Sequence, residues 1–127
     1  MDTIGVKEIS TQHFEHKIWM KQLNFFRDEL KIYEHQLEDL VGKTAKDMLP
    51  KLEHFQNSFL RQREVLKKMR HEIKNHEREI AAAFQADQEL SYPSHIAHEE
   101  FREEMKTFEK LYKELKEEFL TFWKKWH

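Results

Sequence analysis

The sequence predicts an all-α protein, an up-down-up antiparallel three-helix bundle with long helices and coiled-coil-like packing. The chain of 127 residues contains only two Gly and two Pro, which leaves few places for the tight turns that β-rich folds need repeatedly. Apolar residues recur in steps of three and four along three long segments, which is the period of a packed helix. Charged residues make up 36% of the chain, well above the typical value of about 25%, as expected for amphipathic helices with exposed outer faces.

The first predicted helix covers residues 10–42. Ser10 is a suitable N-cap, and Gly42 follows the last apolar position, where a left-handed C-terminal cap is common. The apolar seam, meaning the line of residues that would face the other helices, consists of Trp19, Leu23, Phe26, Leu30, Tyr33, Leu37 and Leu40. The apolar face is widened by four residues beside this seam, namely Phe14, Ile18, Phe25 and Ile32. A face this wide indicates that the helix contacts more than one partner.

The second predicted helix covers residues 47–87 and repeats the same rhythm, with two polar residues at seam positions. Asp47 is suited to cap this helix, because Pro50 then falls in the first turn, where a missing backbone N–H leaves no bond unmade. A short, kinked helical turn that starts at Thr44 is the alternative.

The third predicted helix covers residues 94–126. Pro93 biases Tyr92 away from helical structure, and Ser94 can cap the helix that follows. Its seam consists of His98, Phe101, Met105, Phe108, Tyr112, Leu115, Phe119, Phe122 and Trp126. Since the connections between the helices are short, neighbouring helices are expected to run antiparallel within a single domain that spans residues 1–127.

Charge and composition exclude several classes of function. The net charge of −2 comes from interspersed acidic and basic residues, so the chain lacks the basic field that nucleic-acid binding requires. No segment approaches the ~18 apolar residues of a membrane span, and we expect a cytoplasmic protein. The chain has no Cys and no glycine-rich phosphate loop or nucleophile motif. We therefore expect a protein that is not an enzyme.

Apolar residues at the C-terminal end of the third segment occur on more faces than two neighbouring helices can cover. The residues concerned are Phe119, Leu120, Trp123 and Trp126. In one interpretation Leu120 and Trp123 fold back onto the first helix near Ile32. In the other, these four residues bind a partner, since exposed aromatic patches often mark interfaces. The leading functional hypothesis is association with another protein, most simply as a homodimer.

The nine histidines of the chain support an alternative hypothesis. Counting residues outward from the connections places His16 opposite residue 71, within about two helical turns of His76. The same count places His76 opposite Met105, with Glu104 within reach, while His98 falls about two turns nearer the end of the bundle. Two histidines and a carboxylate suit Zn, Fe or Mn. The alternative function is therefore a divalent metal-binding bundle, with Zn or Fe as the ion.

The same histidines also have a purely structural interpretation, which we favour from the sequence alone. A polar residue in an apolar seam commonly forms a hydrogen bond to a neighbouring helix and fixes its register. This interpretation applies to His16, His76 and Gln62.

Overall fold

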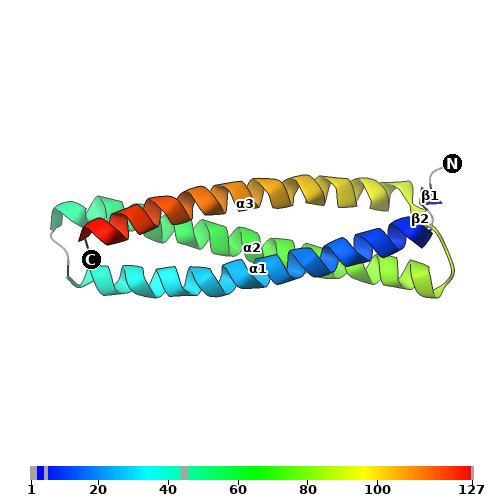
Figure 1. Cartoon of the computed structure of the whole chain (residues 1–127), viewed down its shortest axis with the longest axis horizontal. Coiled ribbons are helices and arrows are strands. Elements are labelled where there is room, and N and C mark those ends of the chain that lie inside the picture. The colour runs from blue at the N-terminus through cyan, green and yellow to red at the C-terminus, as the bar shows by residue number, and fades with distance from the viewer. Residues whose placement is uncertain (1–2, 5, 44–45, 127) are drawn as a thin grey trace.

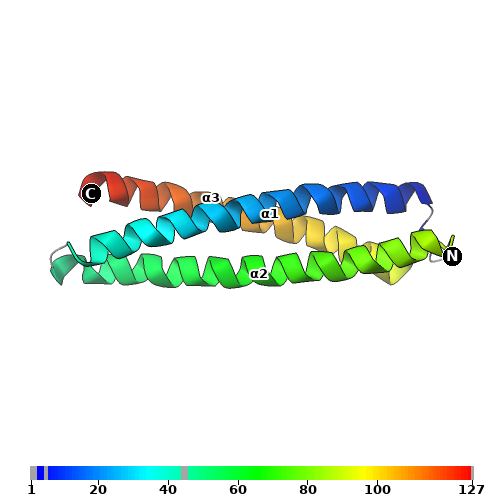
Figure 2. The same ribbon diagram turned by 90° about the horizontal axis from the view of Figure 1, so that it is seen from below.

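The computed structural model describes residues 3–4, 6–43 and 46–126 and contains three long helices, which confirms the predicted all-α three-helix class. The helices are α1 (Val6–Val41), α2 (Leu49–Gln85) and α3 (Tyr92–Trp126). A 3-10 helix, η1 (Lys46–Met48), precedes α2. At a rise of 1.5 Å per residue, α1 is about 54 Å long, so the molecule is a thin rod (Figures 1 and 2).

Side-chain contacts fix how the helices lie against one another. Between α1 and α2, His13 bonds to Glu77 and Glu34 bonds to Arg63, so the numbers rise along one helix as they fall along the other. Between α1 and α3, the numbers rise together, since Glu15 bonds to Arg102 and Glu29 bonds to Lys116. The chain therefore runs along the rod, back and along it again (Figure 1).

The connection between α2 and α3 reverses the chain early, at Asp87. This residue has a positive φ of 53°, and the N–H groups of Asp87 and Gln88 bond to the carbonyls of Phe84 and Ala83, which is the Schellman pattern of a helix end. The next residues form strand β2 (Leu90–Ser91), which pairs with β1 (Thr3–Ile4) in an antiparallel ribbon. The chain has therefore already turned back toward the middle of the bundle before α3 begins at Tyr92.

Four predicted caps are wrong. Ser10 lies inside α1, which begins at Val6, and Gly42 does not take a positive φ. The N-cap of α2 is Met48, without a side-chain bond, and Asp47 lies in η1. Ser94 lies inside α3, where its N–H bonds to the Oγ of Ser91, so Ser91 is the cap that satisfies the first turn. The alternative start at Thr44 lies outside the described residues.

The buried side chains form two apolar clusters separated by a polar layer. The main cluster runs from Trp19 to Phe122 and contains nearly all the predicted seam residues. A small cluster at the ribbon end consists of Ile9, Ile80 and Leu90. Between them lie three buried polar residues, namely Gln12, His16 and His98. The apolar core is therefore interrupted by a layer of polar side chains near the ribbon end.

Candidate metal centre

Each helix contributes one histidine to the polar layer. His16 of α1, His76 of α2 and His98 of α3 each offer a ring nitrogen, and these three nitrogens lie within 4.8 Å of one another. The nearest pair is His16 Nε2 and His76 Nδ1, at 3.0 Å. The ring centroids lie 4.9 to 5.4 Å apart; the rings of His16 and His76 meet edge to face, and the other two pairs are tilted. We call these residues the three-histidine centre.

The contact of His16 with His76 agrees with the expectation from the sequence, and the inclusion of His98 does not. His16 and His76 are in direct contact, whereas the expectation that His98 lies outside their layer is wrong. The count from the sequence placed the chain reversal in the middle of the second connection. Because the reversal occurs at Asp87, and because extended residues of β2 advance about 3.3 Å each, His76 lies beside Ser94 instead of near Met105.

Glu104 does not belong to the group of converging nitrogens. It lines a recess of about 360 Å³ between α2 and α3, together with His16 and His76. The pKa of its carboxyl group is raised by partial burial and by the negative charge of Glu72. Its role as a ligand stays a prediction; in the structure the imidazole of His98, and not this carboxylate, lies with those of His16 and His76.

Burial keeps the imidazoles of His16 and His98 uncharged. His16 and His98 are 4% and 1% exposed. Desolvation lowers the pKa of His16 from 6.5 to about 3, and the nearby His76 and His98 add to the effect. Desolvation also lowers the pKa of His98, although Glu15 opposes this shift. Since metal ions bind the neutral imidazole, both side chains are in the form that a ligand needs at neutral pH.

Hydrogen-bond acceptors on the outer side of the rings fix which nitrogen carries the proton. His98 donates from Nε2 to Glu15, and His76 donates from Nε2 to the carbonyl of Ser94. The lone pairs of these two rings are therefore on Nδ1, and the Nδ1 of His98 has no partner among the described residues. Outer acceptors of this kind orient the histidine ligands of known metal sites.

For a cation to bind at the centre, the proton of His16 would have to move from Nε2 to Nδ1. The Nε2 of His16 donates to His76 Nδ1, which leaves the Nδ1 of His16 buried and without a hydrogen-bond partner among the described residues. The carboxylate of Glu77 lies 3.5 Å from that Nδ1. If the proton moves to Nδ1, Glu77 becomes its acceptor, and Nε2 is free to join the other two lone pairs. The bond between His16 and His76 thus occupies the position that a cation would take.

The carboxylate that holds His98 is itself anchored. Arg102 donates to both oxygens of Glu15, at 2.6 and 3.0 Å. This guanidinium is the main reason that the pKa of Glu15 is lowered, so the carboxylate stays ionised as an acceptor. On the other side, Trp19 stacks on His98 with ring centroids 4.9 Å apart. His98 is therefore held both by a charged bond and by an aromatic face.

The distances of the centre fit a tetrahedral ion after a small contraction. Zn–N bonds of about 2.0–2.1 Å place tetrahedral ligand nitrogens roughly 3.3 Å apart. One pair is already closer than this, at 3.0 Å, and the widest separation is at most 4.8 Å. Side-chain rotations that move the ring nitrogens by about 1–2 Å would bring all three to the tetrahedral separation. Three protein ligands would leave one coordination position for water or another group.

The burial of His16 predicts a loss of stability in acid. In the unfolded chain His16 binds a proton below its ordinary pKa of 6.5, whereas in the folded chain it binds this proton only near pH 3. The free energy of unfolding therefore falls as the pH falls from 6.5 toward 3. Urea unfolding between pH 7.5 and 5 should show this fall in the wild type and a shallower fall in His16→Leu. His35→Leu, at an exposed position of α1, is the control, and a slope equal in His16→Leu and wild type would contradict the prediction.

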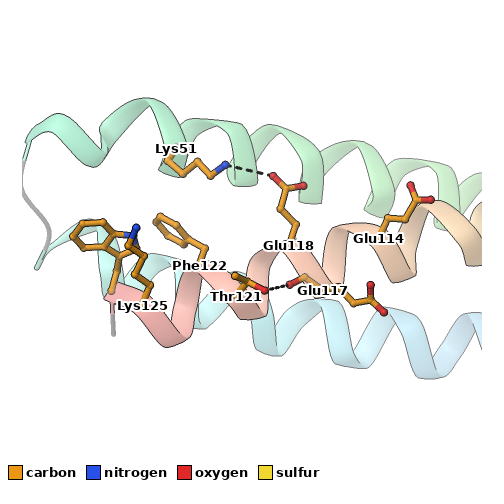
Figure 3. Close-up of a pocket in the computed structure, with 8 residues that line it drawn as sticks. Lys51, Glu114, Glu117, Glu118, Thr121, Phe122 and Lys125 are labelled. Atoms are coloured by element: carbon orange, nitrogen blue, oxygen red, sulfur yellow. Dashed lines mark hydrogen bonds and ion pairs between the residues drawn. The ribbon is translucent and has the colours of Figure 1, made fainter.

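The predicted partner-binding residues are not all available to a partner. Phe119 is completely buried in the core between Tyr33, Phe55 and Phe59, which corrects its assignment to an interface. Leu120 and Trp123 are partly buried and pack against the same core. Trp126 is 43% exposed and lines an open recess of about 520 Å³ with Phe122 and Lys51. Figure 3 shows this recess, where Lys51 pairs with Glu118 across α2 and α3.

The larger exposed apolar surface is on α1. Phe14, Ile18, Phe25 and Ile32 are each 40–63% exposed, and their spacing of four, seven and seven residues places them on one face. We call these four residues the α1 stripe. The sequence places them beside the seam, and the structure leaves them uncovered within the described part of the chain.

Within the described residues, none of the three helices has a stretch both long and apolar enough to cross a membrane. Comparison with protein-family models, with curated proteins and with solved structures finds no match for this chain.

Proposed function

We propose that this protein binds a divalent transition-metal ion through His16, His76 and His98. The observation that carries the proposal is the convergence of three imidazoles from three different helices, two of them buried and one half-buried, each with an acceptor near its outer nitrogen. Buried polar groups normally satisfy one another, yet ring nitrogens of His16 and His98 have no partner among the described residues. A bound cation would accept the lone pair of His98 Nδ1 directly, and the proton shift within His16 would let its Nδ1 donate to Glu77.

The chemistry of the ligands narrows the class of ion. Imidazole suits Zn²⁺, Cu²⁺, Ni²⁺ and Fe²⁺, whereas Mg²⁺, Ca²⁺ and Mn²⁺ prefer oxygen ligands. Since the converging atoms are nitrogens, we propose Zn²⁺ or Fe²⁺, as in the sequence-based hypothesis, and a role in binding, such as sensing or storage, and not in catalysis. The structural interpretation of the histidines is the competing one, and it predicts no metal.

Titration with Co²⁺ tests the proposal, because Trp19 lies against the centre and Co²⁺ quenches nearby tryptophan fluorescence. In a Trp123→Phe/Trp126→Phe background, we expect quenching that saturates at one equivalent and reverses with excess Zn²⁺. His98→Ala should weaken binding by more than about 100-fold, since even an outer partner of a ligand is worth 10–100-fold.

Glu104→Gln is the matched control for this titration. If the three imidazoles are the ligands, this variant should bind one equivalent with an affinity near that of the wild type. A loss as large as that of His98→Ala would restore the carboxylate predicted from the sequence as a ligand. Absence of saturable quenching in the wild type would leave the histidines as register-setting residues.

A second candidate function is homodimerisation, which we propose from the α1 stripe together with Trp126. Four large apolar side chains on one face of α1 form the kind of patch that marks interfaces. Leu120 and Phe26 line an adjoining groove of about 510 Å³ between α1 and α3. The association would therefore involve α1 more than the aromatic end of α3.

Light scattering at ~100 µM tests this candidate. A dimer should have twice the chain mass of 15.7 kDa. A dimer that is stable at this concentration needs an interface of about 1,000 Å² or more. Phe25→Glu/Ile32→Glu should shift the population to monomers, whereas Leu60→Glu, at an exposed apolar position of α2, should not. A wild-type protein that is monomeric at this concentration would end the homodimer hypothesis.

A further inference from the structure

Two recesses lead to His16, and they lie between different pairs of helices. The first lies between α1 and α2 and has a volume of about 320 Å³. The second lies between α2 and α3, has a volume of about 360 Å³ and also reaches His76. An ion that moves between solvent and the three-histidine centre can pass through either, so the side chains that line each recess decide between them.

The two recesses carry opposite charge. The recess between α1 and α2 is lined by the cations Lys17, Lys74 and Arg78, with Glu77 as the one carboxylate. The recess between α2 and α3 is lined by four carboxylates, namely Glu72, Glu79, Glu100 and Glu104, and by no lysine or arginine among the described residues. A cleft with one sign of charge and low-dielectric walls concentrates ions of the opposite sign.

Neighbouring groups weaken this field only in part. Lys68 pairs with Glu72 at 3.8 Å, but its side chain is 78% exposed and stays outside the recess. Glu79 accepts a hydrogen bond from Ser94. Glu72, Glu100 and Glu104 line the same recess. Burial and the charges of Glu72 and Glu100 raise the pKa of Glu104, and Lys68 opposes this shift only in part. A divalent cation between these carboxylates would relieve the repulsion.

We propose that divalent cations enter and leave the three-histidine centre through the recess between α2 and α3, drawn in by Glu72 and Glu104. The inference rests on the proposed metal-binding function and adds the route and the residues that serve it. The imidazoles of His16 and His98 are neutral and carry no net charge that would attract a cation from solvent. The carboxylates hold the hydrated ion at the mouth while imidazole nitrogens replace its water ligands, so Glu104 acts in transfer and His98 in final binding.

A steric block distinguishes a route from a general effect of charge. Ala97 is exposed and lines the recess, so Ala97→Phe fills the passage without changing either end state. With Co²⁺ as the probe and stopped-flow quenching of Trp19 as the signal, we expect association and dissociation to slow in parallel by about tenfold. The dissociation constant should not change. Met20→Phe, which adds bulk to the other recess, should leave both rates unchanged.

A second pair of variants tests the carboxylates without adding bulk. Glu72→Gln/Glu104→Gln should slow Co²⁺ association about 3–10-fold at low ionic strength, and the difference from wild type should shrink as salt screens the field. Glu64→Gln/Glu103→Gln removes the same charge from exposed positions elsewhere and should change the rate much less. An equal effect of the two pairs would show that net charge, and not the recess, controls association.

The outcomes separate this inference from the proposed function. If Met20→Phe slows exchange and Ala97→Phe does not, the ion uses the recess between α1 and α2, and the inference is wrong while metal binding stands. If the wild type shows no saturable Co²⁺ signal at equilibrium, the proposed function fails, and the route fails with it.

Discussion

Zn²⁺ at a free concentration about 1,000-fold above its dissociation constant is expected to raise the free energy of unfolding by about 4 kcal/mol. For a chain of this length this corresponds to a rise in melting temperature of roughly 10–20 °C. The physical reason is that the centre draws one ligand from each of three helices, so it exists only in the folded protein. His76→Ala should abolish the rise, which differential scanning calorimetry measures directly.

The comparison must be made against the melting temperature of each variant without metal. His76→Ala also removes the bonds of His76 to His16 and Ser94, so its own stability will be lower. His71→Ala, at an exposed position of the same helix, should keep the full response to Zn²⁺. If Zn²⁺ leaves the wild-type curve unchanged, the centre does not bind this ion.

Phe119→Ala is expected to lower the free energy of unfolding by about 3–5 kcal/mol, the range for loss of a buried aromatic ring. Phe119 is 0% exposed and its ring lies 5.0–5.6 Å from those of Phe59, Phe55 and Tyr33. Its removal therefore leaves a cavity at the junction of all three helices. Urea unfolding measures the change.

Trp126→Ala is the matched control for this prediction, because Trp126 is at the same end of α3 and is 43% exposed. Its effect on stability should stay within about 1 kcal/mol. If Phe119→Ala also costs less than about 1 kcal/mol, then Phe119 is not part of the core, and its assignment to a partner interface would return.

The fold was predictable because burial follows the helical period. The first predicted seam, from Trp19 to Leu40, is buried at every position except Phe26, which is partly buried. The caps were less predictable, because Ser10, Asp47 and Ser94 are residues that a helix can also hold in its first turns. The coiled-coil type of side-chain packing stays a prediction.

The candidate site was only partly predictable, since it depends on register between helices. The contact of His16 with His76 depends on the first connection, where counting residues gave nearly the correct offset. The position of His98 depends on the reversal at Asp87, a residue that takes a left-handed conformation less readily than Gly does. One signal was present in the sequence: His98 occupies a seam position, which makes it a buried residue. That seam position predicts burial of His98, but the residue count along the helices did not place it beside His16 and His76.

Because α1 and α3 run parallel, the distance between two labels placed at opposite ends of these helices would report on the straightness of the rod. Glu29 of α1 lies beside Tyr112 and Lys116 of α3, so a residue near the end of α3 is level with one near the end of α1. Exposed positions such as Ser10 and Lys125 are then roughly 45 Å apart along the rod. Since the chain contains no Cys, Ser10→Cys and Lys125→Cys would accept a pair of dyes at these positions alone, and energy transfer between the dyes would register bending or fraying of the rod.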